Sequence, residues 1–118
     1  MRNSDLDRSL VEKMHGEAPP EWFVSDGCSC SPDFLGPIDL RSSCHWHDWA
    51  YHQGGLESHR FQADRDLWRN IRECGAKRWW ANVYYYRVRA WGFDHFHYWG
   101  TSKPSACRRM WTIIFGRY

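Results

Sequence analysis

The chain has 118 residues, enough for one small domain with a modest core, and we expect a single domain over residues 1–118. It contains no run of about 18 apolar residues, which excludes a transmembrane helix. Its five cysteines are an odd number, which argues against a complete disulfide framework. The nine tryptophans are more large rings than so small a core can hide, so we expect part of them near the surface.

The net charge of +2 conceals an asymmetry between the two parts of the chain. Residues 1–75 carry eight Lys or Arg and thirteen Asp or Glu, a balance of −5, whereas residues 76–118 carry eight Lys or Arg and one Asp, a balance of +7. A basic and aromatic part of this kind can meet an anionic membrane surface, and nucleic acid is a lesser alternative. A solvated basic face on an ordinary domain explains the pattern equally well.

The first five residues, Met1-Arg2-Asn3-Ser4-Asp5, are polar, and no apolar run follows them, so no signal peptide is visible. We expect a protein that is made soluble. Its compartment stays open; the cytoplasm and the inside of a particle are both compatible, with action after release.

Apolar residues at helical spacing predict a first helix over residues 6–14, with Ser4 and Asp7 as a capping box and Gly16 as its end. Residues 24–38 are rich in turn formers and predict an ordered loop.

Two longer helices are expected next. The first covers residues 39–52 and stops at Gly54-Gly55; the second covers residues 58–74 and stops at Gly75. The short link between them favours an antiparallel arrangement.

A further helix is expected over residues 76–91, followed by an irregular aromatic tail. Residues 110–115 form a short apolar run that is compatible with a strand or a helix. The consecutive tyrosines 84–86 cannot all face inward. The apolar side of this helix would carry Trp80, Val83, Tyr84, Val88 and Trp91.

The stretch Cys44-His45-Trp46-His47-Asp48-Trp49-Ala50-Tyr51 carries the strongest chemical signal. On a helix, residues 44, 47, 48 and 51 share one face, because side chains three and four apart are neighbours. A thiol, an imidazole, a carboxylate and a phenol would therefore lie side by side. His45 and His52 point elsewhere, and we expect both at the surface.

The second long helix contains two acids in different settings. Asp64 lies in an apolar stripe with Phe61, Leu67, Trp68 and Ile71, whereas Asp66 shares a polar, water-facing side with Gln62, Arg69, Asn70 and Glu73. Burying a carboxylate costs several kcal/mol unless it is paired. We therefore predict that Asp64 takes a partner from the facing helix, which offers His47 and Tyr51.

These residues resemble the phospholipase A2 superfamily. The family has a calcium loop, X-Cys-Gly-X-Gly, followed by a helix with Cys-X-X-His-Asp-X-X-Tyr. Here Gly27-Cys28-Ser29-Cys30-Ser31 stands in the place of the loop, residues 44–51 match the helix, and residues 63–68 resemble the segment with the supporting Asp. The match covers residues 24–72 and is closest to the short bacterial, phage and viral members.

The resemblance implies a mostly α-helical fold, in which two antiparallel helices carry the catalytic residues, an N-terminal helix lies beside them and an ordered loop binds calcium. It implies a Ca²⁺-dependent hydrolysis of the sn-2 ester of glycerophospholipids at a membrane surface. His47 would be the general base on water, and Asp64 and Tyr51 would support it. The Ca²⁺ ligands would be Asp48 and the carbonyls of Gly27, Ser29 and Ser31.

The resemblance also implies a disulfide between Cys28 and Cys44, with Cys30 as the competing partner. Ser29 and Ser31 depart from the glycines of the family loop, and serine does not share the backbone freedom of glycine. A non-catalytic binding module, which would meet a protein or nucleic-acid partner through its basic aromatic part, is therefore the alternative. A zinc domain is the third hypothesis, with its ligands drawn from Cys28, Cys30, Cys44, His45, His47 and His52.

Overall fold

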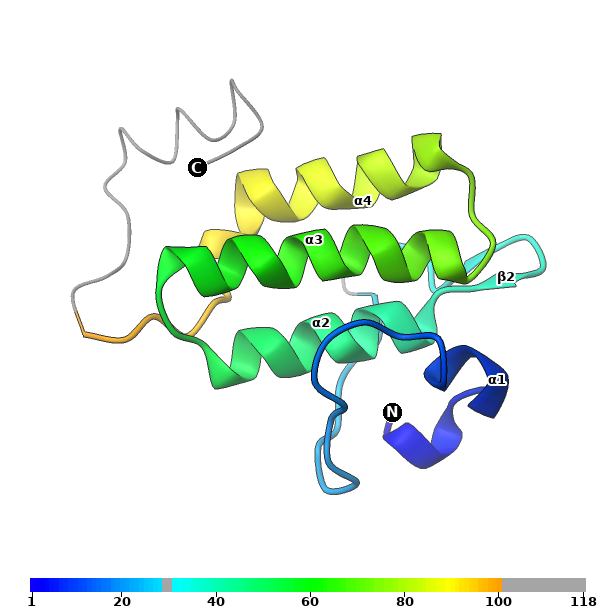
Figure 1. Cartoon of the computed structure of the whole chain (residues 1–118), viewed down its shortest axis with the longest axis horizontal. Coiled ribbons are helices and arrows are strands. Elements are labelled where there is room, and N and C mark those ends of the chain that lie inside the picture. Colours follow the sequence, from blue (N-terminus) through cyan, green and yellow to red (C-terminus); the bar gives the residue numbers. More distant parts are fainter. Residues whose placement is uncertain (29–30, 101–118) are drawn as a thin grey trace.

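The protein is mostly α-helical, as expected, with one short two-stranded sheet. This is seen in a computed structural model that describes residues 1–28 and 31–100. In chain order the elements are η1 (Asn3–Asp5), α1 (Arg8–Val11), β1 (Phe34–Leu35), β2 (Ile38–Asp39), α2 (Arg41–Gln53), α3 (Glu57–Glu73), α4 (Arg78–Trp91) and η2 (Gly92–Asp94). The three long helices lie side by side, with α3 between α2 and α4 (Figure 1).

The three long helices begin and end within two residues of the bounds that the sequence predicts. Gly54 follows α2 with a φ of 71°, a backbone angle that favours glycine, and its N–H donates to the Ala50 carbonyl. A side chain at Gly54 would also collide with the carbonyl of His97. Position 54, in the link from α2 to α3, therefore requires glycine. The link turns the chain back so that α3 runs antiparallel to α2.

The core lies where the three long helices meet. On α4, Tyr84 is buried, whereas Tyr86 is 54% exposed, which confirms that the three tyrosines do not all face inward. Trp91 lies on the same side of α4 as Tyr84 and Val88, since all three line one cavity, but it is the last residue of the helix and is 67% exposed. The buried cluster consists of Cys28, Leu40, Cys44, Leu67, Ile71, Ala76, Ala81 and Tyr84.

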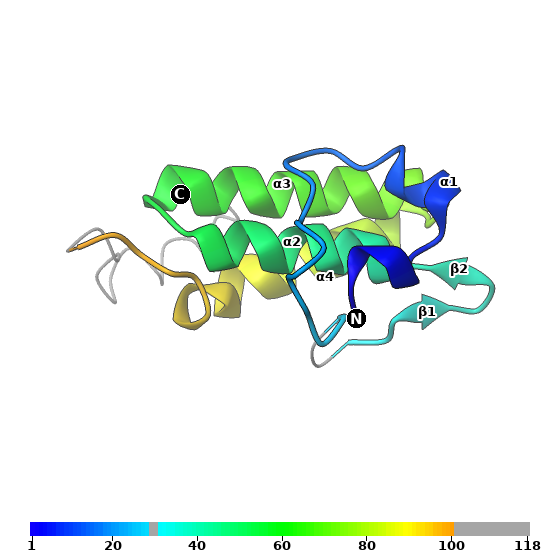
Figure 2. The same ribbon diagram turned by 90° about the horizontal axis from the view of Figure 1, so that it is seen from below.

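The N-terminal helix is shorter than predicted. Asp7 is its cap and accepts a hydrogen bond from the N–H of Ser9 at 3.0 Å, whereas Leu6 before it is extended. The chain then crosses α2 and α3 (Figures 1 and 2), where Asn70 binds both backbone groups of His15, at 2.6 and 3.1 Å. Asn70 is therefore buried, which corrects its expected place on a water-facing side.

The expected loop over residues 24–38 contains a short hairpin. Strands β1 and β2 are antiparallel, with Leu35 opposite Ile38, and Gly36 in the turn has a φ of 60°. Asp39 belongs to β2 and not to the helix, because its carboxylate accepts the N–H of Arg41 at 3.0 Å and so precedes the first turn of α2.

A disulfide joins Cys28, in the loop before the hairpin, to Cys44 in α2. The competing partner, Cys30, lies outside the described residues, as does the apolar run at 110–115. Among the described cysteines, Cys74 is free and half-buried. No helix in residues 1–28 and 31–100 has the length and apolar character needed to cross a bilayer.

Replacement of both bridged cysteines by serine tests the contribution of this link. The bridged residues are 16 apart, and closing a loop of that size in the unfolded chain corresponds to about 3 kcal/mol of stability. We expect urea unfolding of Cys28→Ser/Cys44→Ser to show a loss of about this size. Cys74→Ser, which replaces a free cysteine, is the control and should lose less stability. If the double variant were as stable as the unchanged protein, the disulfide between Cys28 and Cys44 would be contradicted.

Candidate functional site

His47 and Asp64 meet in the space between α2 and α3. Nε2 of His47 lies 2.7 Å from Oδ1 of Asp64, and both side chains are buried, Asp64 completely. An ionised carboxylate only accepts hydrogen bonds, so Nε2 carries the proton of this pair. The remaining ring nitrogen, Nδ1, is then unprotonated in the neutral imidazole and able to accept a proton.

Tyr51 holds the same carboxylate. Its hydroxyl donates to Oδ1 of Asp64 at 2.7 Å, and its ring lies 4.2 Å from the ring of His47. Burial, with the charge of Asp64, raises the pKa of the Tyr51 phenol well above its usual range, so it stays a donor. Gly92 packs on the hydroxyl so closely that any side chain there would collide with it. The partners predicted for Asp64 are thus the partners found.

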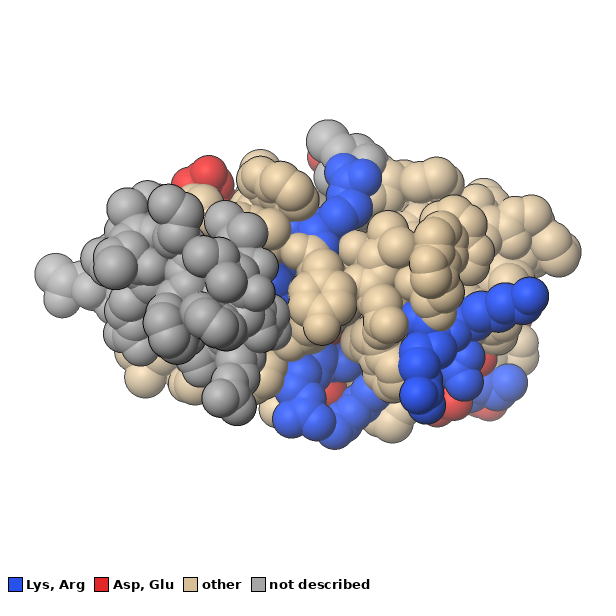
Figure 3. Space-filling view, turned by 90° about the horizontal axis from the view of Figure 1, so that it is seen from above, with Lys and Arg blue, Asp and Glu red and all other residues tan. Residues whose placement is uncertain are grey.

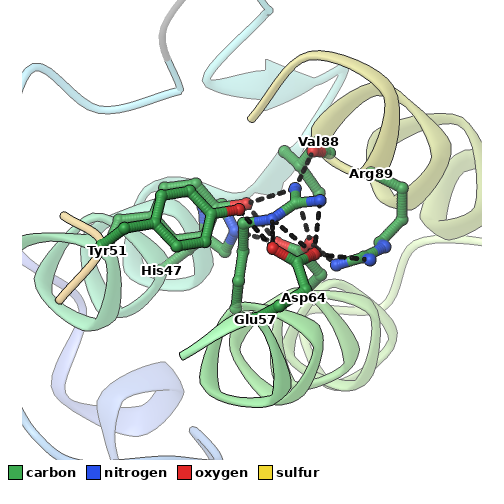
Figure 4. Close-up of polar contacts among 8 residues, drawn as sticks. His47, Tyr51, Glu57, Asp64, Val88 and Arg89 are labelled. Atoms are coloured by element: carbon green, nitrogen blue, oxygen red, sulfur yellow. Dashed lines mark hydrogen bonds and ion pairs between the residues drawn. The ribbon is translucent and has the colours of Figure 1, made fainter. Parts of the chain in front are cut away.

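Two buried arginines hold the other side of Asp64, and Figure 4 shows one of them, Arg89. Arg89 of α4 donates to Oδ2 at 2.7 Å, and Arg60 of α3 lies 3.6 Å from the same oxygen. Glu57 pairs with both arginines, and Tyr98 donates to Glu57. The cluster therefore pairs two carboxylates with two guanidiniums, and their charges cancel.

Sequence reasoning missed this cluster. The spacing of Glu57, Arg60 and Asp64 places all three on one face of α3, a signal that was available in the sequence. Arg89 had no such signal, because its contact depends on how α4 packs against α3.

His47 borders a cavity of about 450 Å³ between α2, α4 and the loop after Gly27. It also borders a second hollow, of about 300 Å³, which residues 15–17 line from the N-terminal segment (residues 1–25). Of the two, the larger cavity is the one that Asp48, Gly27 and Ser31 also line, and these are the residues predicted to act together with His47. The wall that faces them is mainly apolar and consists of Leu67, Tyr84, Val88 and Trp91, with Arg87 and His95 beside it.

Asp48 is adjacent to His47 and is mostly buried without an ion pair among the described residues. Burial raises the pKa of its carboxyl to about 6; the charge of Asp26 acts in the same direction and His47 opposes both. A carboxylate in this setting is more stable when a cation neutralises it.

The predicted cation ligands besides Asp48 are carbonyl oxygens of the backbone. The described residues contain no cluster of three His, Cys, Asp or Glu side chains that could hold a metal. Gly27 and Ser31 do line the cavity, and no hydrogen bond among the described residues uses their carbonyl oxygens. One carboxylate with backbone carbonyls is a donor set that suits Ca²⁺, a hard cation. Ser29, the third predicted carbonyl, lies outside the described residues.

His45 is not at the surface as expected, but completely buried. Residues 22–25 cover this side of α2, and the hydroxyl of Ser25 lies 2.6 Å from Nδ1 of His45. Burial, with the positive amino terminus, lowers the pKa of His45. His52 is exposed, as predicted.

The zinc hypothesis is not supported by the arrangement of its predicted ligands in residues 1–28 and 31–100. Cys28 and Cys44 bind each other, His47 is held by Asp64, and His45 and His52 lie elsewhere on α2.

No protein-family model, curated protein or solved structure matches the chain.

Asp48→Asn is expected to stabilise the protein when metal is removed with EDTA. The folded pKa of about 6 lies above the ordinary 3.8, so the unfolded chain loses this proton first as the pH rises, and stability falls between these two values. Well above pH 6 the variant should be more stable by roughly 2–3 kcal/mol, and below 3.8 the gain should vanish.

Urea unfolding at both pH values checks this expectation. Asp26→Asn, which removes an exposed carboxylate nearby, is the matched control and should gain less free energy of unfolding. A gain that is the same at both pH values would show that the carboxylate charge is not its cause.

Proposed function

We propose that this protein is a Ca²⁺-dependent phospholipase A2-like esterase, which hydrolyses the sn-2 ester of glycerophospholipids. The observation that carries the proposal is the joint position of four residues. His47 is held through Nε2 by Asp64, Tyr51 holds the same carboxylate, and Asp48 lies on the same cavity as His47. This arrangement supports the mechanism implied by the resemblance of residues 24–72 to the phospholipase A2 superfamily.

In this mechanism Nδ1 of His47 takes a proton from a water molecule as the water attacks the ester carbonyl. Asp64 keeps the proton on Nε2 and stabilises the imidazolium that forms, and the buried hydroxyl of Tyr51 keeps Asp64 in place. The imidazolium then returns the proton to the leaving alkoxide. The products are a lysophospholipid and a free fatty acid.

Asp48, with the carbonyls of Gly27 and Ser31, would hold the cation. When bound, Ca²⁺ would supply a Lewis acid for the ester carbonyl and for the oxyanion. The raised pKa of Asp48 supports this role, because a half-buried carboxylate with no ion pair among the described residues has the most to gain from a cation.

The wall of the cavity fits an acyl chain and a membrane surface. Leu67, Tyr84 and Val88 provide apolar area inside, whereas Trp91 at the end of α4 is exposed and lies next to the cavity with Arg87. Exposed tryptophan beside arginine is typical of groups that enter the headgroup region.

The activity is tested with phospholipid vesicles. We expect fatty-acid release with millimolar calcium, which stops in EDTA. His47→Ala should lower the rate by about 100-fold or more, because it removes the general base. His52→Ala, which removes an exposed histidine from the same helix, is the matched control. Absence of release under every calcium condition would overturn the proposal.

The role of Trp91 is tested by comparison with Trp79. Both are exposed residues of α4, 67% and 63%, but only Trp91 lines the cavity. We expect Trp91→Ala to weaken vesicle binding roughly tenfold, since an apolar ring no longer enters the membrane. Trp79→Ala should bind as the unchanged protein does; a sedimentation assay measures both, and equal losses would contradict an orientation with the cavity toward lipid.

A second function is favoured by a different surface. A groove of about 310 Å³ lies between α3 and α4, with Arg65, Arg69, Tyr85 and Tyr86 among its lining residues. Figure 3 shows α4 from outside, with Lys and Arg side chains next to uncharged surface. Guanidinium groups and aromatic rings together suit a nucleic-acid or acidic protein partner. Tight, salt-sensitive binding through this groove without ester hydrolysis would support a binding module instead.

A further inference from the structure

We propose that Arg89 is a positioning residue for the His47–Asp64 pair. It holds Asp64 from the third helix of the site, so that one carboxylate oxygen remains directed at His47. The inference extends the proposed esterase function and depends on it for its catalytic meaning, but the contact itself can be tested without substrate.

The two oxygens of Asp64 have separate partners. Oδ1 accepts from Nε2 of His47 and from the hydroxyl of Tyr51, each at 2.7 Å. Oδ2 accepts from Nη1 of Arg89, also at 2.7 Å. A carboxylate held by only one oxygen can rotate about its bond to the chain, whereas one held at both oxygens by different helices cannot. The proton on His47 therefore has an acceptor of fixed position.

Arg89, and not Arg60, is the main partner of Oδ2. The guanidinium of Arg60 lies farther from Oδ2, at 3.6 Å, and its donors are used by both oxygens of Glu57 and by the carbonyl of Val88. Arg89 points one nitrogen at Asp64 and the other at Glu57, 3.1 Å away. This fork is a geometry that lysine does not provide.

The environment of Arg89 gives the contact its strength. Arg89 is 1% exposed and Asp64 is completely buried, so water does not screen their interaction. The guanidinium also lies over the ring of Phe61, 5.2 Å from its centre. Figure 4 shows Arg89 reaching from α4 to the carboxylates of α3, with His47 and Tyr51 on the side of α2.

Arg89 also connects the site to the cavity wall. Val88 and Trp91, which line the cavity, belong to the same helix end as Arg89. The contact thus fixes α4 relative to the imidazole, and the wall that would receive the acyl chain stays in register with the general base.

The main variant of the test keeps the buried charges in balance. Arg89→Gln/Glu57→Gln removes one guanidinium and one carboxylate and leaves Asp64 with Arg60. Glu57→Gln alone keeps the contact between Arg89 and Asp64. Arg78→Gln, an exposed arginine in the first turn of α4, is the matched control. Arg89→Lys keeps the positive charge but loses the fork.

The first measurement is the nitrogen NMR spectrum of the histidine rings, with His47 assigned from its loss in His47→Ala. We expect a protected Nε2–H signal for His47 in the unchanged protein, in Glu57→Gln and in Arg78→Gln. In the double variant this signal should exchange with water and disappear. Persistence of the signal in a double variant with unchanged helical circular dichroism would overturn the proposal.

The second measurement is the rate of vesicle hydrolysis. We expect kcat of the double variant to fall roughly 10- to 100-fold with KM changed less than about twofold, because the base is misplaced while the cavity remains. If the double variant does not fold, Arg89→Lys carries the same two readouts. Loss of the NMR signal in a protein that never hydrolyses ester would refute the proposed function but not the positioning of His47, whereas unchanged kcat in an active protein would refute the inference.

Discussion

The burial of one carboxylate, that of Asp64, is the constraint on which the rest of the site depends. Removing a charged group from water costs several kcal/mol unless hydrogen bonds and opposite charges surround it. Each of the three long helices supplies part of this compensation: His47 and Tyr51 from α2, Arg60 from α3 and Arg89 from α4. The same contacts that make the buried charge tolerable also orient an imidazole, so stability and chemical competence have a common origin.

The two acids of the site are treated in opposite ways. Asp64 has a full set of partners and serves as a fixed acceptor, whereas Asp48, one helical position after His47, is mostly buried and has a pKa raised to about 6. A carboxylate with a raised pKa lowers the stability of the folded protein at neutral pH, and groups of this kind are frequent at functional sites. Asp48 is where a cation would change the protein most.

The loop and the N-terminal segment depend on α2 for their places. The disulfide ties Cys28 to the helix that carries His47, and so brings Gly27 and Ser31 to the cavity. On the opposite side of α2, residues 22–25 cover His45. Short irregular segments thus pack on two sides of helix α2, and its face with His47, Asp48 and Tyr51 lines the cavity. This is why the described part of the chain, residues 1–28 and 31–100, presents a defined site with little regular structure besides three long helices.

The sequence by itself determined the helices and one half of the site. Glycines and apolar spacing are local signals, and they placed the long helices within two residues; the stripe of Asp64 selected its partners because a buried acid needs them. Only the tertiary structure decided what lies beyond two helices. It buried His45 and Asn70 under the N-terminal segment, exposed Trp91 and brought Arg89 to Asp64. Those outcomes depend on which surfaces pack together, and no spacing within one segment records that choice.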